Sequence, residues 1–377
     1  MGTLFDYLNW RGDLSFSQSP LNEVDSLIFS LLSYVDFSGI VPSNFTDGGI
    51  PLRAAANTFA SKYPDPAKRD NIGLILPKET VPLLLAAKNT RRFQDILLKG
   101  FVNVINTETE IQFSATTFII PEIGAVVAYR GTDDTLIGWK EDFNMSFLPE
   151  VPAQRAAAEY LQMIAPHIPS PIYVTGHSKG GNLSVWASVH ASPEIRARIR
   201  QVFCNDGPGF GPGMLENPDY IEMRPRIKFF VPQSAVIGIL LEHNENYTVV
   251  KSRTAGLLQH DAFTWSISGT SFIYEETVTA TSKRIDRTLN DWVRKMTPAQ
   301  REQFVETMFQ MLSTNKDLTL TELFEQSKKR GFLKTLVMPD PEVREASQKM
   351  LGLLLELGKQ NIRTTIHEHL PKGKKEQ

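Results

Sequence analysis

Residues 172 to 181 read Ile-Tyr-Val-Thr-Gly-His-Ser-Lys-Gly-Gly, and this stretch decides which fold to expect. A β-branched and aromatic run, Ile172–Thr175, comes first, and a segment typical of a helix follows from Asn182 to Ala191. Between them stands Gly-x-Ser-x-Gly with Ser178 at its centre. The motif alone also occurs in ordinary turns, but small neighbours between a strand and a helix allow the sharp turn that exposes a hydroxyl. The stretch therefore predicts a nucleophile elbow, with Ser178 attacking an acyl carbon.

The rest of the sheet is indicated by runs of β-branched and aromatic residues that alternate with helical patterns. Strands are expected at 102–105, 112–120, 125–129, 172–175, 201–204, 227–231 and 247–250, and helices at 21–36, 52–62, 81–100, 152–163 and 182–191. Alternation of strands and helices predicts an α/β fold with a mostly parallel sheet covered on both faces.

After about Ile273 the strand patterns stop, which predicts a hydrolase-like domain over 1–275 and a helical C-terminal region over 276–377. Thr297, Pro298 and Gln300 supply an N-cap, a proline at the first helical position and a capping glutamine, so a helix is expected to about residue 312. Further helices are expected at 321–330 and 341–360, with a disordered basic tail at 371–377. These helices are the candidate surface for a protein partner.

Composition excludes several classes of function. The chain has 377 residues, 41% of them hydrophobic, and a net charge of −2, which gives no reason to expect a nucleic-acid partner. No apolar run approaches the roughly 18 to 20 residues that span a bilayer, and the N-terminus lacks a secretory pattern. A single cysteine, Cys204, excludes an internal disulfide framework. We therefore expect a cytoplasmic protein without a transmembrane segment.

No cofactor is expected. The glycines between Gly207 and Gly213 resemble a phosphate-binding loop, but Pro212 stands where a Gly-x-Gly-x-x-Gly begun at Gly207 needs its last glycine. The sequence also lacks the Gly-Lys-Ser/Thr of a P-loop, and it suggests no metal site.

A serine nucleophile needs a base and an acid that orients the base. His260 follows the last strong strand, which suits the order serine, acid, histidine. Asp206 stands at the end of the strand after the nucleophile, where active-site groups of parallel sheets collect. Alternatively, Asp206 only forms an Asx-turn before Gly207, and the acid is Glu242 or Asp261.

Two backbone donors are expected to stabilise an oxyanion. Lys179 begins the helix after the nucleophile, so its N–H points toward the substrate. Thr132, in Arg130-Gly131-Thr132, follows a strand and offers both an N–H and a hydroxyl. Downstream, residues 143–151 are apolar enough to form either a lid over a lipid site or part of the core.

Arg130-Gly131-Thr132 with Trp139-x-x-Asp142, followed by Gly-His-Ser-x-Gly-Gly, resembles the class 3 lipases of the α/β-hydrolase superfamily. The opening residues 2–8, the Asp-Gly-Pro-Gly-Phe loop and Gln259-His260-Asp261 are similar to bacterial lipase-like proteins of the Mbeg-like group. This resemblance implies a serine nucleophile at Ser178, a base at His260 and oxyanion donors at Thr132 and Lys179.

One departure from the class 3 pattern concerns the acid, because the matching segment, 230–236, carries no carboxylate. The resemblance and the motifs together predict a cofactor-free serine hydrolase acting on a small-molecule ester or lipid. A hydrolase-like scaffold that binds a protein partner is the alternative.

Overall fold

A computed structural model describes residues 1–63, 77–121, 123–132, 136–211, 213–241, 247–313 and 345. The helices expected at 321–330 and 341–360, the tail at 371–377 and the alternative acid Glu242 lie outside these residues.

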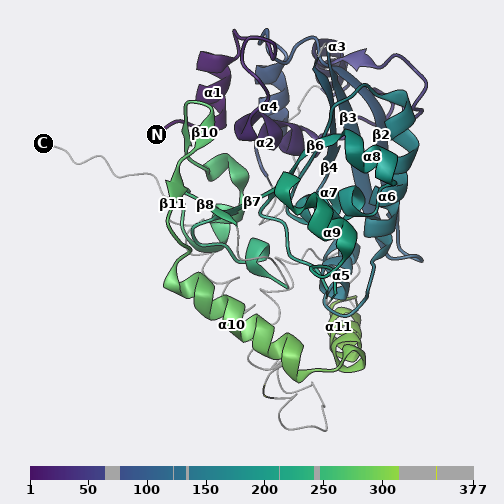
Figure 1. Ribbon diagram of the computed structural model, residues 1–377, viewed down its shortest axis with the longest axis vertical. Helices are drawn as coiled ribbons and strands as arrows, with labels where there is room; N and C mark the ends of the chain where they lie inside the picture. The colour runs from purple at the N-terminus through teal and green to yellow at the C-terminus, as the bar shows by residue number, and fades with distance from the viewer. Residues whose placement is uncertain are drawn as a thin grey trace, which may run out of the picture.

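The described residues form a nine-stranded sheet in the order β1-β2-β3-β4-β5-β6-β7-β8-β11 (Figure 1). Its strands are β1 (Ile50–Pro51), β2 (Leu97–Asn106), β3 (Ile111–Ile120), β4 (Gly124–Tyr129), β5 (Ile172–His177), β6 (Ile199–Asn205), β7 (Ile227–Pro232), β8 (Thr248–Val250) and β11 (Tyr274–Glu275). Strands β4 to β8 run parallel, and the pairs on either side of them are antiparallel. A short hairpin of β9 (Ile267–Ser268) and β10 (Ser271–Phe272) lies outside this sheet. The architecture is the expected α/β-hydrolase-like one, with a parallel centre and antiparallel edges.

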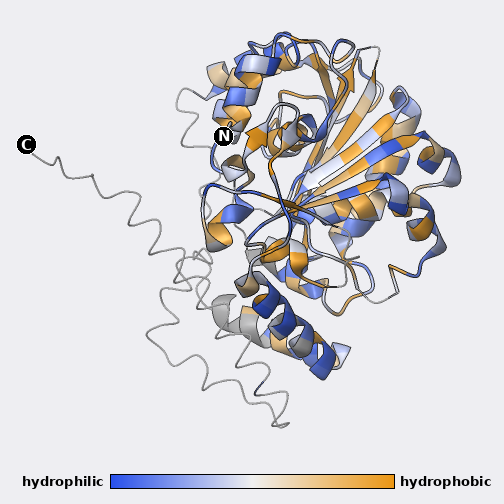
Figure 2. Cartoon of the chain, turned by 60° about the vertical axis from the view of Figure 1, so that its left-hand side comes forward, coloured by the Kyte–Doolittle hydropathy of each residue, from blue (hydrophilic) through white to orange (hydrophobic). Residues whose placement is uncertain are grey.

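Helices cover both faces of the sheet because the strands carry apolar side chains on both sides. In β4, Val126 and Ala128 pack into one core, whereas Val127 and Tyr129 pack into the other. The first core is closed by α1 (Leu4–Arg11), α2 (Glu23–Leu32), α3 (Leu52–Lys62) and α4 (Thr80–Ala87). The second is closed by α6 (Pro152–Ile164), α7 (Lys179–Val189), α8 (Pro193–Arg198) and α9 (Pro218–Met223). Figure 2 shows the hydrophobic residues concentrated in the strands between these layers.

The helix expected at 81–100 is wrong in its second half. Helix α4 ends at Ala87, and β2 begins at Leu97, where Leu97 and Leu98 pair with Ile119 and Phe118 of β3. The register shifts between Lys99 and Val102, and Gly100 there has a φ of 64°. A β-bulge with a glycine in the left-handed region thus interrupts the strand pattern.

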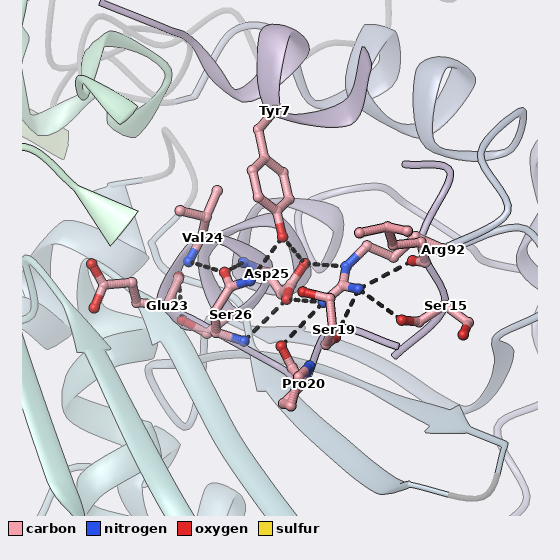
Figure 3. A network of polar contacts seen from close by, with 11 residues as sticks. Tyr7, Ser15, Ser19, Pro20, Glu23, Val24, Asp25, Ser26 and Arg92 are labelled. Carbon is pink, nitrogen blue, oxygen red and sulfur yellow. Dashed lines mark hydrogen bonds and ion pairs between the residues drawn. The ribbon is translucent and has the colours of Figure 1, made fainter. Parts of the chain in front are cut away.

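A buried polar network fastens the N-terminal segment to this core (Figure 3). The guanidinium of Arg92 contacts both carboxylate oxygens of Asp25, at 2.8 and 2.5 Å, and Tyr7 donates to the same carboxylate at 2.8 Å. Both partners of the ion pair are fully buried. Asp25 thereby joins α1, α2 and the segment after α4.

Helices α5 (Leu136–Asn144), α10 (Ala280–Lys295) and α11 (Pro298–Ser313) lie together at one end of the molecule (Figure 1). The expected capping box of α11 is present, since Thr297 N–H donates to Gln300 Oε1 at 2.8 Å and Gln300 N–H donates to Thr297 Oγ1 at 3.3 Å. Phe309 of α11 packs edge-on against Phe143 of α5 with ring centroids 6.0 Å apart. Within the described part of the chain, no helix is long and apolar enough to cross a bilayer.

Candidate active site

The turn between β5 and α7 has the geometry of a nucleophile elbow. Ser178 adopts φ 58° and ψ −133°, a strained conformation for a residue with a side chain. A Cβ on Gly176 would lie 2.0 Å from the carbonyl oxygen of Gly180, and one on Gly180 would lie 2.1 Å from that of Tyr129. Both flanking glycines are therefore required by close backbone approach. Ser178 is held there by its N–H, which donates to the carbonyl of Asn205 at 2.9 Å.

The candidate base and the candidate acid lie side by side. His260 Nδ1 is 2.6 Å from Asp206 Oδ2, and both side chains are buried. Because a carboxylate only accepts hydrogen bonds, Nδ1 carries the proton and Nε2 is the nitrogen with a free lone pair. The Asx-turn alternative does not describe Asp206, whose other oxygen, Oδ1, accepts from the N–H of Gly238 at 3.0 Å. The alternative acid Asp261 instead accepts from the N–H of Phe263 at 3.1 Å and caps a short 3-10 helix.

His177, to which the sequence analysis assigned no role, contacts the candidate base His260. Its Nε2 lies 2.8 Å from the carbonyl oxygen of His260, and the two imidazole centroids are 4.7 Å apart. The hydroxyl of Tyr34 lies 3.0 Å from His177 Nδ1. Burial lowers the pKa of His177 well below its usual value, and the neighbouring His260 lowers it further. A neutral His177 that donates from Nε2 and accepts at Nδ1 satisfies both contacts and ties the loop of His260 to the elbow.

The loop after β4 lies directly against the elbow. A Cβ on Gly131 would be 2.2 Å from the Tyr34 hydroxyl, 2.6 Å from the carbonyl of His177 and 3.0 Å from Cβ of Ser178. Only glycine fits at this position, and its neighbour Thr132 follows immediately. The hydroxyl of Thr132 donates to Asp142 Oδ2 at 2.6 Å, so its proton is not directed at an oxyanion. Of the two oxyanion donors expected from Thr132, only the backbone N–H therefore stays a candidate.

The side chain of Lys179 points away from the elbow into the interior. Its ammonium donates to the carbonyl oxygen of Gln112 at 2.9 Å, to Gln112 Oε1 at 2.6 Å and to Glu141 Oε2 at 2.9 Å. The Lys179–Glu141 pair is fully buried. Glu141 also accepts from the N–H groups of Gln112 and Ala153, at 3.2 and 2.7 Å. The position of Lys179 directly after Ser178 indicates a role in the candidate site. Its side-chain partners on β3 and α5 could not be predicted from the sequence.

The segment 143–151, expected as a lid or as core, begins in the last turn of α5 and contacts α11. Met145 and Val151 are buried, and Phe143 packs against Phe309. Arg301 of α11 also donates to the carbonyl oxygen of Ser146. This segment therefore contributes to packing in the conformation described.

The candidate site residues all follow sheet strands, at the carboxyl ends of β4 (Thr132), β5 (Ser178 and Lys179) and β6 (Asp206) and after β8 (His260).

A comparison with curated proteins found no match. Among solved structures, the crystal structure of M37 lipase is similar, with a TM-score of 0.37 and 16% identity over 59% of this chain and 71% of that one. A likeness at this level carries no argument about chemistry. A family model described as Mbeg1-like matches residues 87–310, more than half of the chain, and on that match the chain belongs to the Mbeg1-like family.

Proposed function

We propose that the protein is a serine hydrolase that cleaves carboxylic esters through an acyl-enzyme, with Ser178 as nucleophile, His260 as base and Asp206 as acid. The observation that carries this proposal is the 2.6 Å contact between His260 Nδ1 and Asp206 Oδ2. Both residues are linked to the strained turn of Ser178, because His177 contacts the carbonyl of His260 and the N–H of Ser178 donates to Asn205. The short contact between two buried side chains supports the proposal, because the acid of a serine-histidine-aspartate triad orients its histidine through a hydrogen bond to Nδ1.

In the proposed reaction, His260 Nε2 takes the hydroxyl proton of Ser178 as Oγ attacks the ester carbonyl. Asp206 stabilises the imidazolium that forms and keeps its orientation. The N–H groups of Lys179 and Thr132 donate to the oxyanion of the tetrahedral intermediate. The imidazolium then protonates the leaving alcohol, and the same residues activate a water molecule that releases the acid.

The alternative of a catalytically weak scaffold rested on the missing carboxylate in the segment 230–236. There the N–H of Ser234 donates to Gln259 Oε1 at 2.6 Å, so this segment braces the residue that precedes His260. Asp206 supplies a carboxylate to the histidine from the neighbouring strand end, and the missing carboxylate no longer favours the scaffold. The proposed acid therefore lies on a different strand end from the acid of the class 3 pattern.

Hydrolysis of short p-nitrophenyl esters tests the proposal. Ser178→Ala and His260→Ala should each remove nearly all turnover, and the double variant should be scarcely worse than either, because the two groups act as a unit.

Asp206→Asn should lower kcat by roughly 10³- to 10⁴-fold by favouring the wrong imidazole tautomer of His260. The matched control is His167→Ala, an exposed histidine, which should keep full activity. Turnover that survives in Ser178→Ala would refute the nucleophile.

A further inference from the structure

Gln112, at the start of β3, links the two proposed oxyanion donors. Its Oε1 accepts from the ammonium of Lys179 at 2.6 Å, and its Nε2 donates to the carbonyl oxygen of Gly131 at 3.5 Å. That carbonyl belongs to the peptide unit whose N–H is the N–H of Thr132. The carboxamide therefore reaches from the side chain of one donor residue to the peptide that carries the other.

The orientation of this carboxamide is fixed by charge. An ammonium donates only, so Oε1 faces Lys179 and the NH₂ group is left for Gly131. Lys179 is held in turn by Glu141, and neither ionic side chain is exposed. Gln112 is itself fully buried, so no water competes for its amide. Because the ammonium is also held by Glu141 and by the backbone carbonyl of Gln112, it stays in place and keeps Oε1 of the amide facing it.

We propose that Gln112 is a positioning residue that aligns and polarises the Gly131–Thr132 peptide so that the Thr132 N–H donates to the developing oxyanion. A hydrogen bond to a peptide carbonyl makes the N–H of the same peptide a stronger donor. The 3.5 Å contact is long in the free protein, as catalytic hydrogen bonds often are before the transition state forms. Its contribution therefore enters kcat more than KM.

This inference rests on the proposed function, and two substitutions separate the two roles of the amide. Gln112→Glu keeps an acceptor for Lys179 but turns an oxygen, instead of an NH₂ group, toward the Gly131 carbonyl. Gln112→Met removes both groups while leaving Lys179 the Gln112 backbone carbonyl and Glu141. Because loss of a whole oxyanion donor costs about 10²- to 10³-fold, loss of its alignment should lower kcat by about 10- to 100-fold with KM within about twofold.

The matched control is Gln201→Glu on β6, because Gln201 Nε2 also donates to a backbone carbonyl, that of Arg226, away from the elbow. The control should keep the kcat of the unsubstituted protein. Esterase kinetics are measured beside thermal melts, and Gln112→Met serves if Gln112→Glu does not fold. A folded Gln112 variant with unchanged kcat, or with a change in KM alone, overturns the inference while Ser178-dependent turnover stands. Absence of that turnover in the unsubstituted protein refutes the proposed function itself.

Discussion

Two buried ion pairs in this molecule have similar burial and different surroundings. Arg92 and Asp25 join at 2.5 Å, and Lys179 and Glu141 join at 2.9 Å, with every side chain involved fully buried. The guanidinium of Arg92 also donates to backbone carbonyls of one loop, those of Leu14, Ser15, Ser19 and Pro20. It lies 3.8 Å from the ring centroid of Phe16 as well. This pair closes a loop and packs it on the core.

The Lys179–Glu141 pair joins segments that come from different parts of the site. Lys179 follows Ser178, and the next residue after Glu141, Asp142, accepts from Thr132. A planar guanidinium suits a fan of loop carbonyls, whereas an ammonium suits three acceptors that converge on one point. The comparison teaches that buried charge alone does not mark function. The difference between the pairs lies in whether the partners are attached to groups of the proposed active site.

Removal of one partner from the loop-closing pair should give the largest effect on stability. Asp25→Ala leaves the Arg92 guanidinium buried without its carboxylate, and we expect a loss of about 3 to 5 kcal/mol in the free energy of unfolding. Urea unfolding measures the loss, and esterase assays at a temperature where the variant is folded should give an unchanged kcat. A marked fall in kcat of the folded variant would show that the two pairs are not separate in function.

Asp261 can be compared with the carboxylates of the two ion pairs, because it is half-buried and burial makes its charged form unfavourable. Burial raises the pKa of Asp261 from its ordinary value to about 6. Because the pKa of Asp261 is higher in the folded state than in the unfolded state, protonation of this carboxyl stabilises the fold. That stability is fully present below the unfolded pKa and is lost as the pH rises through about 6. Asp261→Asn should therefore be more stable than the unsubstituted protein above pH 6, by about 1 to 3 kcal/mol, and the difference should narrow toward pH 4. Thermal melts across this range measure it, and a difference independent of pH would contradict the assignment.

Glu141→Gln tests whether the second pair serves the site. The substitution places an NH₂ group among N–H donors and weakens the hold on Lys179, so we expect kcat to fall about tenfold with little change in KM. Asp25→Asn is the matched change in the other pair and should leave kcat unchanged. Equal kcat values for the two folded variants would remove the distinction between the pairs.

The smallest effect should come from an exposed pair. Arg155 contacts Glu150 at 2.9 Å with 68% and 30% of the two side chains exposed. Since such pairs contribute less than about 1 kcal/mol, Arg155→Gln should change neither the unfolding midpoint nor kcat measurably. A loss comparable to that of Asp25→Ala would mean that exposure does not separate these interactions.

The elbow could be predicted from the sequence because most of its requirements are local. Gly176 is needed because a Cβ there would meet the carbonyl oxygen of Gly180, four positions on, and the strand and helix on either side have clear patterns. The contact that requires Gly180, with the carbonyl oxygen of Tyr129 on the neighbouring strand, is not local, although the motif predicts the glycine. Asp206 could be placed because strand ends of a parallel sheet converge. The helix expected at 81–100 failed because pairing with β3 outweighs local periodicity after Ala87.

Residues that support the site from a distance could not be predicted. Tyr34, two residues after α2, reaches His177 across 143 positions of sequence, and Gln112 reaches Lys179 across 67. Neither side chain belongs to a short motif, and both contacts exist only once the strands are in register. Helix α10 lies within the helical region expected over 276–377, but its bounds were not predicted because its buried residues Ile285 and Trp292 are seven positions apart among many charged ones.

Covalent labelling with a fluorophosphonate tests the central claim most directly, because the probe reacts with a serine that has been activated by its base. Mass spectrometry of the folded protein should find one adduct, on the peptide that contains Ser178. Ser178→Ala should show no adduct, and His260→Ala should label far more slowly. An unlabelled folded protein, or an adduct that persists unchanged in Ser178→Ala, would contradict the assignment of Ser178 as the nucleophile of a serine hydrolase.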